Sequence, residues 1–330
     1  MYTILNTVGP SDRNRLLVIY NDGDTKHLKV ILEGNNTLNL LVDSTISQVT
    51  TITLGGMEPR NLTLPEGDII LNSVCDADTN QKSLYHAIET FSKIDLPIIN
   101  TPEQTLKTTR EQTYLQLSNI PGLRVPKALR ITPFCRADVP KILKEHTLDY
   151  PYIFRSAGEH GGDGMALIKG EDDLHLLEQF AFDSRPFYAI EFVDFQSDDG
   201  LYRKYRMVII DGKVYPRHLI ISKSWNIHSE TRAELMDSDE KFKEEELAYL
   251  SAPHPAVTAQ CSDIHEKLPL DFIGVDCHIN DKGEMLIFEV NTCMRIVADD
   301  PIPYQKPYMD RIKEAFNHLI ERKISAHKRT

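Results

Sequence analysis

The sequence predicts an α/β protein that becomes α+β in its later part. Short β-rich runs mix with a helical pattern over about the first hundred residues, which indicates an open α/β layer. Further on, turns at Asp211-Gly212 and at residues 280–283 join apolar runs, as in β-hairpins. At 330 residues the chain also exceeds the usual size of one domain. We therefore expect three units, residues 1–100, 101–190 and 191–330.

In the first unit, strands are expected wherever a β-rich run lies between polar turns. These are residues 16–20, 28–32, 38–42, 69–71 and 96–100. Residues 83–94 predict a helix, because the apolar side chains from Leu84 to Ile94 recur on one stripe. No G-x-G-x-x-G follows a strand here, so a dinucleotide site has no support.

The later units begin with a helix at Thr101-Pro102, a capping residue followed by proline, that runs to about Leu117. After it, the same two patterns predict seven strands and four helices. The strands are residues 152–156, 165–169, 187–193, 202–210, 213–222, 274–279 and 285–291, and the helices are residues 171–180, 240–250, 255–268 and 304–323.

Composition excludes several classes of function. A net charge of −12 argues against a nucleic-acid partner, which needs a basic face. No apolar run approaches about 18 residues, and the N-terminus lacks a basic region before a long apolar stretch, so neither a membrane span nor a signal peptide is expected. The five cysteines include no C-x-x-C pair, which favours reduced thiols. We expect a cytoplasmic protein.

The most informative residues are Glu289 and Asn291, read together with Asp276 on the preceding strand of one hairpin. Side chains alternate along a strand, so Ile287, Glu289 and Asn291 are expected on one face, opposite Asp276. Three converging oxygen ligands suit Mg²⁺, which also takes phosphates and water. The alternative is a polar edge on an ordinary hairpin.

A glycine-rich loop lies between the two strands predicted at residues 152–156 and 165–169, so it forms a hairpin flap rather than a strand-to-helix loop. Clustered glycines let backbone N–H groups approach phosphate oxygens, and Arg155 at the end of the first strand offers a planar fork of donors. The alternative is a flexible hairpin. The candidate contacts are Arg155, Gly161, Gly162 and Gly164.

Two further patterns indicate binding of a nucleotide and of an anionic group, a polyphosphate or a carboxylate. Glu191, Phe192 and Val193 end an apolar strand and are typical of a hinge that binds the edge of an adenine, although a solvent-facing strand end is the alternative. Lys204 and Arg206 share a strand face, and two such cations repel unless an anion lies between them. An exposed hairpin with charged edges is the alternative there. Arg217 and His218 add to this basic group from across the Asp211-Gly212 turn. Trp225 and His228 follow as candidates for the wall of a substrate pocket, and core packing or a surface role is the alternative for His228.

The order of these motifs is more specific than any one of them. Along the chain the motifs come in this order: a basic residue, a glycine flap, an acidic hinge, an arginine-rich hairpin, an Asp and a Glu-x-Asn. In that order the chain resembles the ATP-grasp superfamily over about residues 100–300. It is most similar to carboxylate–amine ligases of the glutathione-synthetase and ribosomal-S6-modification type. The resemblance implies two α+β subdomains that clamp ATP, preceded by an N-terminal α/β domain.

The resemblance also implies roles for individual residues. Asp276, Glu289 and Asn291 match ligands of two Mg²⁺ ions, with Mn²⁺ as an alternative. Arg206 matches an arginine near the γ-phosphate, and Arg217 one that stabilises the tetrahedral intermediate. The residues that match nucleotide contacts of the family are Arg110, Arg155, Glu191, Phe192, Val193 and Ile287. Together with Gly161, Gly162, Gly164 and Lys204 they form the expected nucleotide site.

Two departures from the family pattern matter. Arg155 stands where the family usually has a lysine, which keeps the charge but changes the hydrogen-bond geometry. After Asn291 the chain reads Thr292-Cys293-Met294-Arg295 instead of the family's small-residue, Pro-Gly loop. Because that loop helps to seat the acceptor, the substrate is not carried over. The substrate candidates are His218, Trp225, His228, Thr292 and Arg295.

The expected function is an ATP-dependent ligase that joins a carboxylate to an amine through an acyl phosphate, on an amino acid or a peptide. Two alternatives stay open: a small-molecule kinase of the same fold, and an ATP-binding module without catalysis. The expected partners are the two small-molecule substrates, with no nucleic acid and no membrane. Relatives are often dimers or tetramers, so the resemblance also points to a homo-oligomer.

Overall fold

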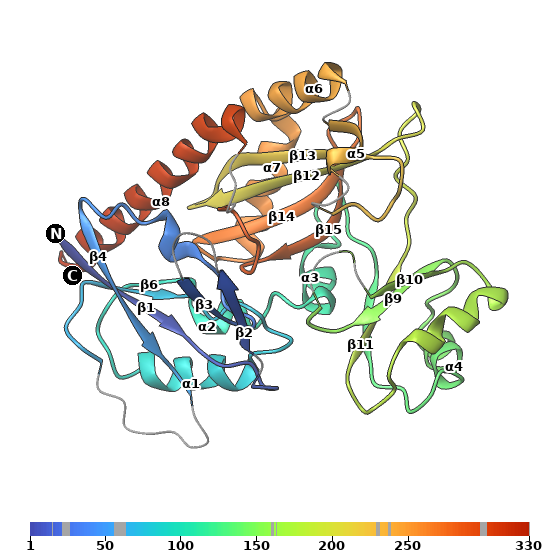
Figure 1. Cartoon of the computed structure of the whole chain (residues 1–330), viewed down its shortest axis with the longest axis horizontal. Coiled ribbons are helices and arrows are strands. Elements are labelled where there is room, and N and C mark those ends of the chain that lie inside the picture. Colours follow the sequence, from blue (N-terminus) through green and yellow to red (C-terminus); the bar gives the residue numbers. More distant parts are fainter. Residues whose placement is uncertain are drawn as a thin grey trace.

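The computed structural model describes residues 1–14, 16–21, 27–55, 64–159, 162, 164–228, 232–236, 239–297 and 302–329. Its strands form three larger sheets and a separate two-stranded hairpin, β2 (Leu16–Asn21) with β3 (His27–Leu32). Figure 1 shows the parallel N-terminal sheet at the lower left, the largest sheet above it and a smaller sheet to one side. No helix in the described ranges has both the length and the apolar character needed to cross a membrane.

The N-terminal sheet is parallel, with strand order β4-β1-β5-β6. Its strands are β1 (Tyr2–Val8), β4 (Ser47–Thr53), β5 (Ile69–Asn72) and β6 (Ile98–Ile99), and α1 (Gln81–Phe91) packs beside them. The expected open α/β layer is confirmed, although the sequence patterns missed β1 and β4. The strand expected at residues 38–42 is wrong. It is a 3₁₀ helix, η1 (Leu38–Leu41), in which three-residue spacing buries both terminal leucines on one side.

The helix expected to run from Pro102 to Leu117 is broken into α2 (Pro102–Thr105) and α3 (Arg110–Leu117). The first run ends at Thr105 in a turn. Thr109 then begins the second run, because its backbone is extended and its side chain accepts a hydrogen bond from the Gln112 N–H. The new N-terminus places Arg110 at the start of α3.

The smaller sheet is antiparallel, with strand order β10-β9-β11-β8. Its strands are β8 (Ala128–Ile131), β9 (Tyr152–Ser156), β10 (Met165–Ile168) and β11 (Phe187–Glu191), covered by α4 (Asp138–Glu145). The glycine-rich loop joins β9 to β10, so the expected hairpin flap is confirmed. The helix expected at residues 171–180 is a run of 3₁₀ structure, η2 (Glu171–Gln179).

The largest sheet has strand order β13-β12-β14-β15-β7. Its strands are β7 (Leu123–Arg124), β12 (Tyr202–Ile210), β13 (Lys213–Ser222), β14 (Phe272–Ile279) and β15 (Met285–Asn291). Asp211 and Gly212 between β12 and β13 both have positive φ, as a two-residue hairpin turn requires. The four predicted strands of this sheet are confirmed, while β7 was not foreseen. The domain boundaries at residues 100 and 190 stay predictions.

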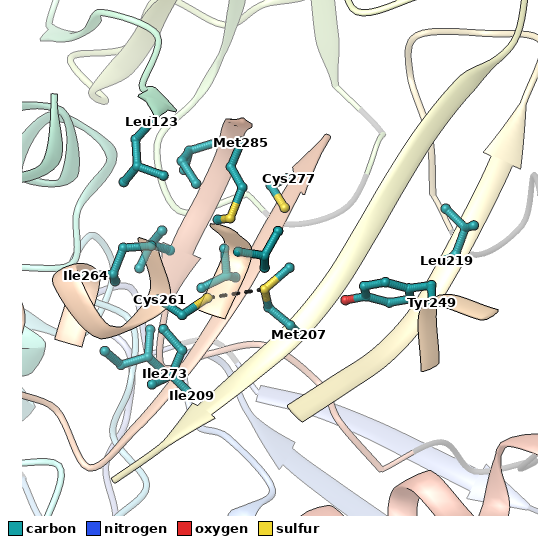
Figure 2. Close-up of a cluster of buried hydrophobic side chains, with 14 of the residues drawn as sticks. Leu123, Met207, Ile209, Leu219, Tyr249, Cys261, Ile264, Ile273, Cys277 and Met285 are labelled. Atoms are coloured by element: carbon teal, nitrogen blue, oxygen red, sulfur yellow. Dashed lines mark hydrogen bonds between the residues drawn. The ribbon is translucent and has the colours of Figure 1, made fainter. Parts of the chain in front are cut away.

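Helices cover both faces of the largest sheet. They are α5 (Arg232–Met236), α6 (Glu240–Ser251), α7 (Pro255–Lys267), the short η4 (Pro303–Gln305) and α8 (Lys306–His327). On one face α6 and α7 enclose the apolar cluster of Figure 2, in which the Cys261 thiol meets the Met207 sulfur at 3.4 Å. On the other face α8 packs on Val208 and Ile210 and extends to the N-terminal sheet. Lys204 and Arg206 share the parity of Val208, so they lie on this second face, beyond its apolar part.

Candidate active site

A pocket forms where the three larger sheets approach one another, and each contributes to its lining. The N-terminal sheet supplies the segment after β5, from Cys75 to Asp78. The smaller sheet supplies β9, the flap and the end of β11. The largest sheet supplies β12, β14 and β15. The apolar part of the lining includes Val125, Ile153, Ile190, Phe195, Trp225 and Leu286.

A row of polar side chains crosses the largest sheet at the pocket. In the strand register His218 lies opposite Arg206, Arg206 opposite Asp276, and Asp276 opposite Glu289. Arg206 donates from Nε and Nη2 to the two carboxylate oxygens of Asp276, at 2.7 and 2.8 Å. Arg110 reaches in from α3 and donates from Nη2 to Glu289 Oε1 at 2.9 Å. Each carboxylate is therefore held by an arginine while it faces the pocket.

A β-bulge in β15 corrects the expected arrangement of its side chains. Asp276 pairs with Glu289, but the next pair is Cys277 with Ile287, so Phe288 is an extra residue in the ladder. The expectation that Ile287 shares a face with Glu289 is therefore wrong. Ile287 is among the lining residues, yet its side chain is buried in the core cluster that contains Cys277.

The oxygen donors at the end of this hairpin fit a hard divalent cation. Asp276, Glu289 and Asn291 all line the pocket, and the side chains of Asp276 and Glu289 are 6% and 20% exposed. Asn291 Oδ1 accepts a hydrogen bond from the Cys293 N–H at 2.9 Å. Among the described residues no three His, Cys, Asp or Glu side chains gather as a metal site. A cation here would depend on the amide of Asn291 and on ligand oxygens, as Mg²⁺ usually does.

Arg155 is buried at the end of β9 with spare hydrogen-bonding capacity. Its guanidinium donates to the Glu159 carbonyl and contacts Met165 Sδ at 3.2 Å. Within the described part of the chain, its buried Nε has no hydrogen-bond partner. Burial, followed by the charge of Arg110, lowers the pKa of Arg155 to about 10, so the group stays cationic at neutral pH. A buried cation with an unpaired donor is suited to an anionic oxygen.

Lys204 provides a second buried cation in the lining. Its Nζ donates to the Ile227 carbonyl at 2.6 Å and lies 3.8 Å from Asp276 Oδ2. Burial lowers the pKa of Lys204, and the carboxylate of Asp276 opposes that shift. As expected from strand alternation, Lys204 and Arg206 both face the pocket.

Of the two candidate flap glycines that the structure describes, Gly162 lines the pocket and Gly164 does not. The Gly162 carbonyl accepts a hydrogen bond from Asn226 Nδ2 at 3.0 Å. A Cβ at this position would lie 2.5 Å from Cδ2 of His228, so the close approach requires glycine. Gly164 has a φ of +65° and open space around it. Gly161 lies outside the described residues.

The expected hinge, Glu191 to Val193, lines the pocket in full. The Glu191 N–H donates to the Lys127 carbonyl at 2.9 Å, and the Phe192 N–H donates to the Pro151 carbonyl at 3.0 Å. Two N–H groups expected to face an adenine are thus already used within the protein. The Glu191 carboxylate pairs with Arg124 and accepts from the Lys127 N–H at 3.1 Å.

Arg217 and His218 are buried and are not among the described residues that line the pocket. Arg217 donates to the Ile296 carbonyl at 2.8 Å and to Gln305 Oε1 at 2.9 Å. Burial, followed by the charge of Arg206, lowers the pKa of Arg217 to about 10. His218 has a pKa well below its ordinary value, because it is buried next to several cations.

The remaining substrate candidates divide into two groups. Trp225 lines the pocket and meets the ring of Phe192 edge to face. Thr292, Arg295 and His228 are outside the described lining. Thr292 is fully buried and donates to the Cys75 carbonyl at 3.1 Å, while the Arg295 carbonyl accepts from Arg206 at 3.1 Å.

The sequence patterns missed the acidic segment after β5. Asp76 and Asp78 both line the pocket. The Asp78 carboxylate accepts from the Tyr188 hydroxyl at 2.8 Å and lies 3.3 Å from Arg130. Burial, followed by the neighbouring charge of Asp76, raises the pKa of Asp78. A signal was present, since ligands bind outside the carboxyl ends of parallel strands and these acids directly follow one.

Comparison with known proteins adds evidence on the fold. No protein-family model matches the sequence, and neither does any curated protein. Among solved structures, a RimK-domain ATP-grasp protein from Sphaerobacter thermophilus has a TM-score of 0.54 at 12% identity, with 98% of this chain and 99% of that chain covered. D-alanyl-alanine synthetase A from Vibrio cholerae has a TM-score of 0.57 at 13% identity, covering 98% and 99%.

D-Alanine–D-alanine ligase from Bacillus anthracis, solved with ATP, has a TM-score of 0.54 at 13% identity and covers 100% of this chain and 99% of that one. These likenesses extend over nearly the whole chain. At such low sequence identities they are evidence for the fold alone. The chain has the ATP-grasp fold, α/β with a parallel N-terminal sheet followed by antiparallel sheets.

Proposed function

We propose that this protein is an ATP-dependent ligase that joins a carboxylate to an amine through an acyl phosphate, with an amino acid or a peptide as substrate. One observation carries the proposal. Arg155, with its unpaired buried Nε, lines the same pocket as the Arg206–Asp276 and Arg110–Glu289 pairs. Cations gathered next to an oxygen donor set are what a polyphosphate and its metal require. The likeness to two ligase structures supports the reaction class.

In this proposal the base of ATP lies in the apolar part of the pocket. Leu286 and Phe195 belong to one apolar cluster, with Trp225 packed against it, and the Glu191–Val193 hinge forms the adjoining edge. The phosphates then extend toward Arg155 and Lys204. The flap carbonyl held by Asn226 keeps Gly162 over that end.

The residues fit a divalent cation by the chemistry of their donors, and the proposal gives Asp276, Glu289 and Asn291 to Mg²⁺, with Mn²⁺ as an alternative. When bound, such an ion neutralises phosphate charge. Arg206 and Arg110 orient the two carboxylates through these hydrogen bonds. Because their arginines hold them in place, little reorganisation is needed when ATP binds.

The reaction proceeds in two steps. The substrate carboxylate attacks the γ-phosphoryl group, ADP leaves, and an acyl phosphate forms. An amine then attacks the acyl carbon and displaces phosphate, which leaves an amide bond. Arg206 lines the pocket and is assigned to the transferred phosphoryl group. Arg217 is assigned to the tetrahedral intermediate, which requires that its guanidinium give up the contacts with Ile296 and Gln305.

A screen for phosphate release tests the proposal. The protein is incubated with ATP, Mg²⁺ and pairs of amino acids or dipeptides, and the products are identified by mass spectrometry. A ligase releases ADP and phosphate only when both co-substrates are present. A phosphorylated product without phosphate release would favour the kinase instead. Tight ATP binding without turnover on any pair would favour a binding module.

A further inference from the structure

We propose that Asp78, Tyr188 and Arg130 form a clasp that fixes the smaller sheet over the pocket, which makes Asp78 a positioning residue for the nucleotide site. Asp78 belongs to the segment after β5, whereas Tyr188 and Arg130 belong to β11 and β8 of the smaller sheet. The effect on ATP binding rests on the proposed function, whereas the docking of the smaller sheet on Asp78 does not.

The smaller sheet presents a row of polar side chains on its pocket side. In the strand register Tyr188 lies opposite Arg130 on one neighbouring strand and opposite Arg155 on the other. Residues that lie opposite each other in a ladder share a face of the sheet, so these three side chains stand side by side. Phe154 and Phe187 point to the other face, where they belong to an apolar cluster. The row therefore includes Arg155, the cation assigned to the phosphates.

Asp78 docks on the middle of this row. The Tyr188 hydroxyl donates to the Asp78 carboxylate, with oxygen–oxygen distances of 2.8 and 3.0 Å, and Arg130 Nε lies 3.3 Å from Asp78 Oδ1. Tyr188 is 1% exposed and the Asp78 side chain 10%, so solvent screens these contacts little. The start of the flap touches the same segment, because a Cβ at Gly158 would lie 2.1 Å from Cγ2 of Thr79.

The turn that carries Asp78 is fixed by hydrogen bonds within its own part of the fold. Asp76 Oδ1 accepts from the N–H groups of Asp78, at 2.7 Å, and of Thr79, at 3.2 Å. The Thr79 carbonyl accepts from the Asp12 N–H at 2.6 Å. Asp78 is thus presented to the smaller sheet in a fixed position, and closing the clasp orders little further chain.

The clasp sets the position of a sheet that strand pairing leaves free. Among the described strands, none of the smaller sheet pairs with a strand of the other two larger sheets. Because Arg155 stands next to Tyr188 in the row, holding Tyr188 also holds Arg155 relative to the Arg206–Asp276 pair. Without the clasp, ATP has to close the sheet itself, and its apparent affinity is reduced by the fraction of molecules that are closed.

Tyr188→Phe tests the clasp, because it removes the hydroxyl and keeps the ring. Affinity for ATP with Mg²⁺ is measured by calorimetry on the whole protein. Loss of a hydrogen bond to a charged group shifts closure about tenfold, so we expect the Kd for ATP to rise about tenfold. In steady-state kinetics the KM for ATP should rise with it, while kcat at saturating ATP stays near that of the parent protein.

Two further variants define the contact. Tyr152→Phe is the matched control, since it removes a buried hydroxyl on the opposite face that has no hydrogen-bond partner in the described part of the chain, and it should keep the parent affinity. Asp78→Ala should raise the Kd at least as much as Tyr188→Phe does. Adding Tyr188→Phe to Asp78→Ala should then change nothing further, because both variants break the same contact.

The docking itself is tested by a distance measurement without ATP. Spin labels are attached to Cys135, before α4, and to Tyr85→Cys on α1, which are both exposed sites. Cys293→Ser in the background removes a third, partly exposed thiol. The parent should give one distance by pulsed electron paramagnetic resonance. Tyr188→Phe should add a longer population, which ATP removes.

Several results would overturn the inference. An unchanged distance distribution in Tyr188→Phe would refute the clasp, and so would a parent-like affinity for ATP or additive losses in the double variant. If the longer population appears in a protein that binds no ATP, the proposed function fails and the clasp stands. ATP turnover with neither the longer population nor a change in affinity defeats the clasp alone.

Discussion

Replacing Glu289 by Gln tests the metal end of the site most directly. The carboxylate lies opposite Asp276 and accepts from Arg110 at 2.9 Å, with a side-chain exposure of 20%. Glutamine keeps an oxygen that can accept from Arg110 but removes the charge. The variant should therefore fold, with a loss of stability of about 1 kcal/mol or less.

The expected loss of activity follows from the electrostatics. A unit charge about 4 Å from an opposite charge contributes about 4 kcal/mol at an effective dielectric constant of about 20. Partial exposure of Glu289 screens part of this, and a remaining loss of about 2.7 kcal/mol corresponds to about 100-fold in rate. The loss should appear in Mg²⁺-dependent ADP formation.

The assay measures ADP release over a range of Mg²⁺ concentrations, together with thermal unfolding of the same samples. Glu284→Gln, in the exposed turn of the same hairpin, is the matched control and should behave as the parent protein does. If Glu289→Gln kept full turnover at every Mg²⁺ concentration, the assignment of the metal to this hairpin would be refuted.

Three further predictions test other parts of the pocket. Gly162→Ala places a Cβ 2.5 Å from His228 Cδ2 and should raise the KM for ATP several-fold, while Gly170→Ala, with open space and no positive φ, should leave it unchanged in steady-state kinetics. Arg217→Ala should lower kcat far more than ATP affinity, and equal losses in both would show that Arg217 binds ground and transition states alike. Asp78→Asn tests a pH effect: the folded-state pKa of Asp78 is raised above the ordinary 3.8, so its contribution to stability is lost as pH rises through that pKa. The variant should gain stability relative to the parent as pH rises from about 4 to neutral in denaturant titrations, and a constant difference would contradict the assigned cause.

The sequence predicted the elements whose signals are local. The hairpin at Asp211-Gly212 forms because both residues take positive φ, and the flap hairpin forms as the glycine pattern indicated. Strand alternation correctly placed Lys204 and Arg206 on one pocket-facing side. The prediction was wrong where a local apolar pattern is compatible with two kinds of secondary structure. At residues 38–42 we expected a strand, but a 3₁₀ helix buries the leucines.

The candidate site was predictable in its charged residues and less so in its geometry. The order of the motifs predicted one site that contains Asp276, Glu289 and Arg206. The strand register aligns these three residues in one row across the sheet. Alternation alone placed Ile287 on the wrong face, because the extra residue Phe288 shifts the register within β15. A bulge of this kind has no short-range sequence signal, since its position depends on the partner strand.

The sequence by itself determined the order of the motifs, the period of each strand and the kinds of side chain available for phosphate and metal. Each of these properties depends only on residue type and on the stereochemistry of a short stretch of chain, so the local sequence is enough to predict it. Only the tertiary structure decided that the acids after β5 enter the pocket, that Arg217 is outside its described lining, and that Thr292 meets Cys75. The reason is physical: each of these depends on a contact between distant segments, fixed by how the sheets pack together and not by any local preference.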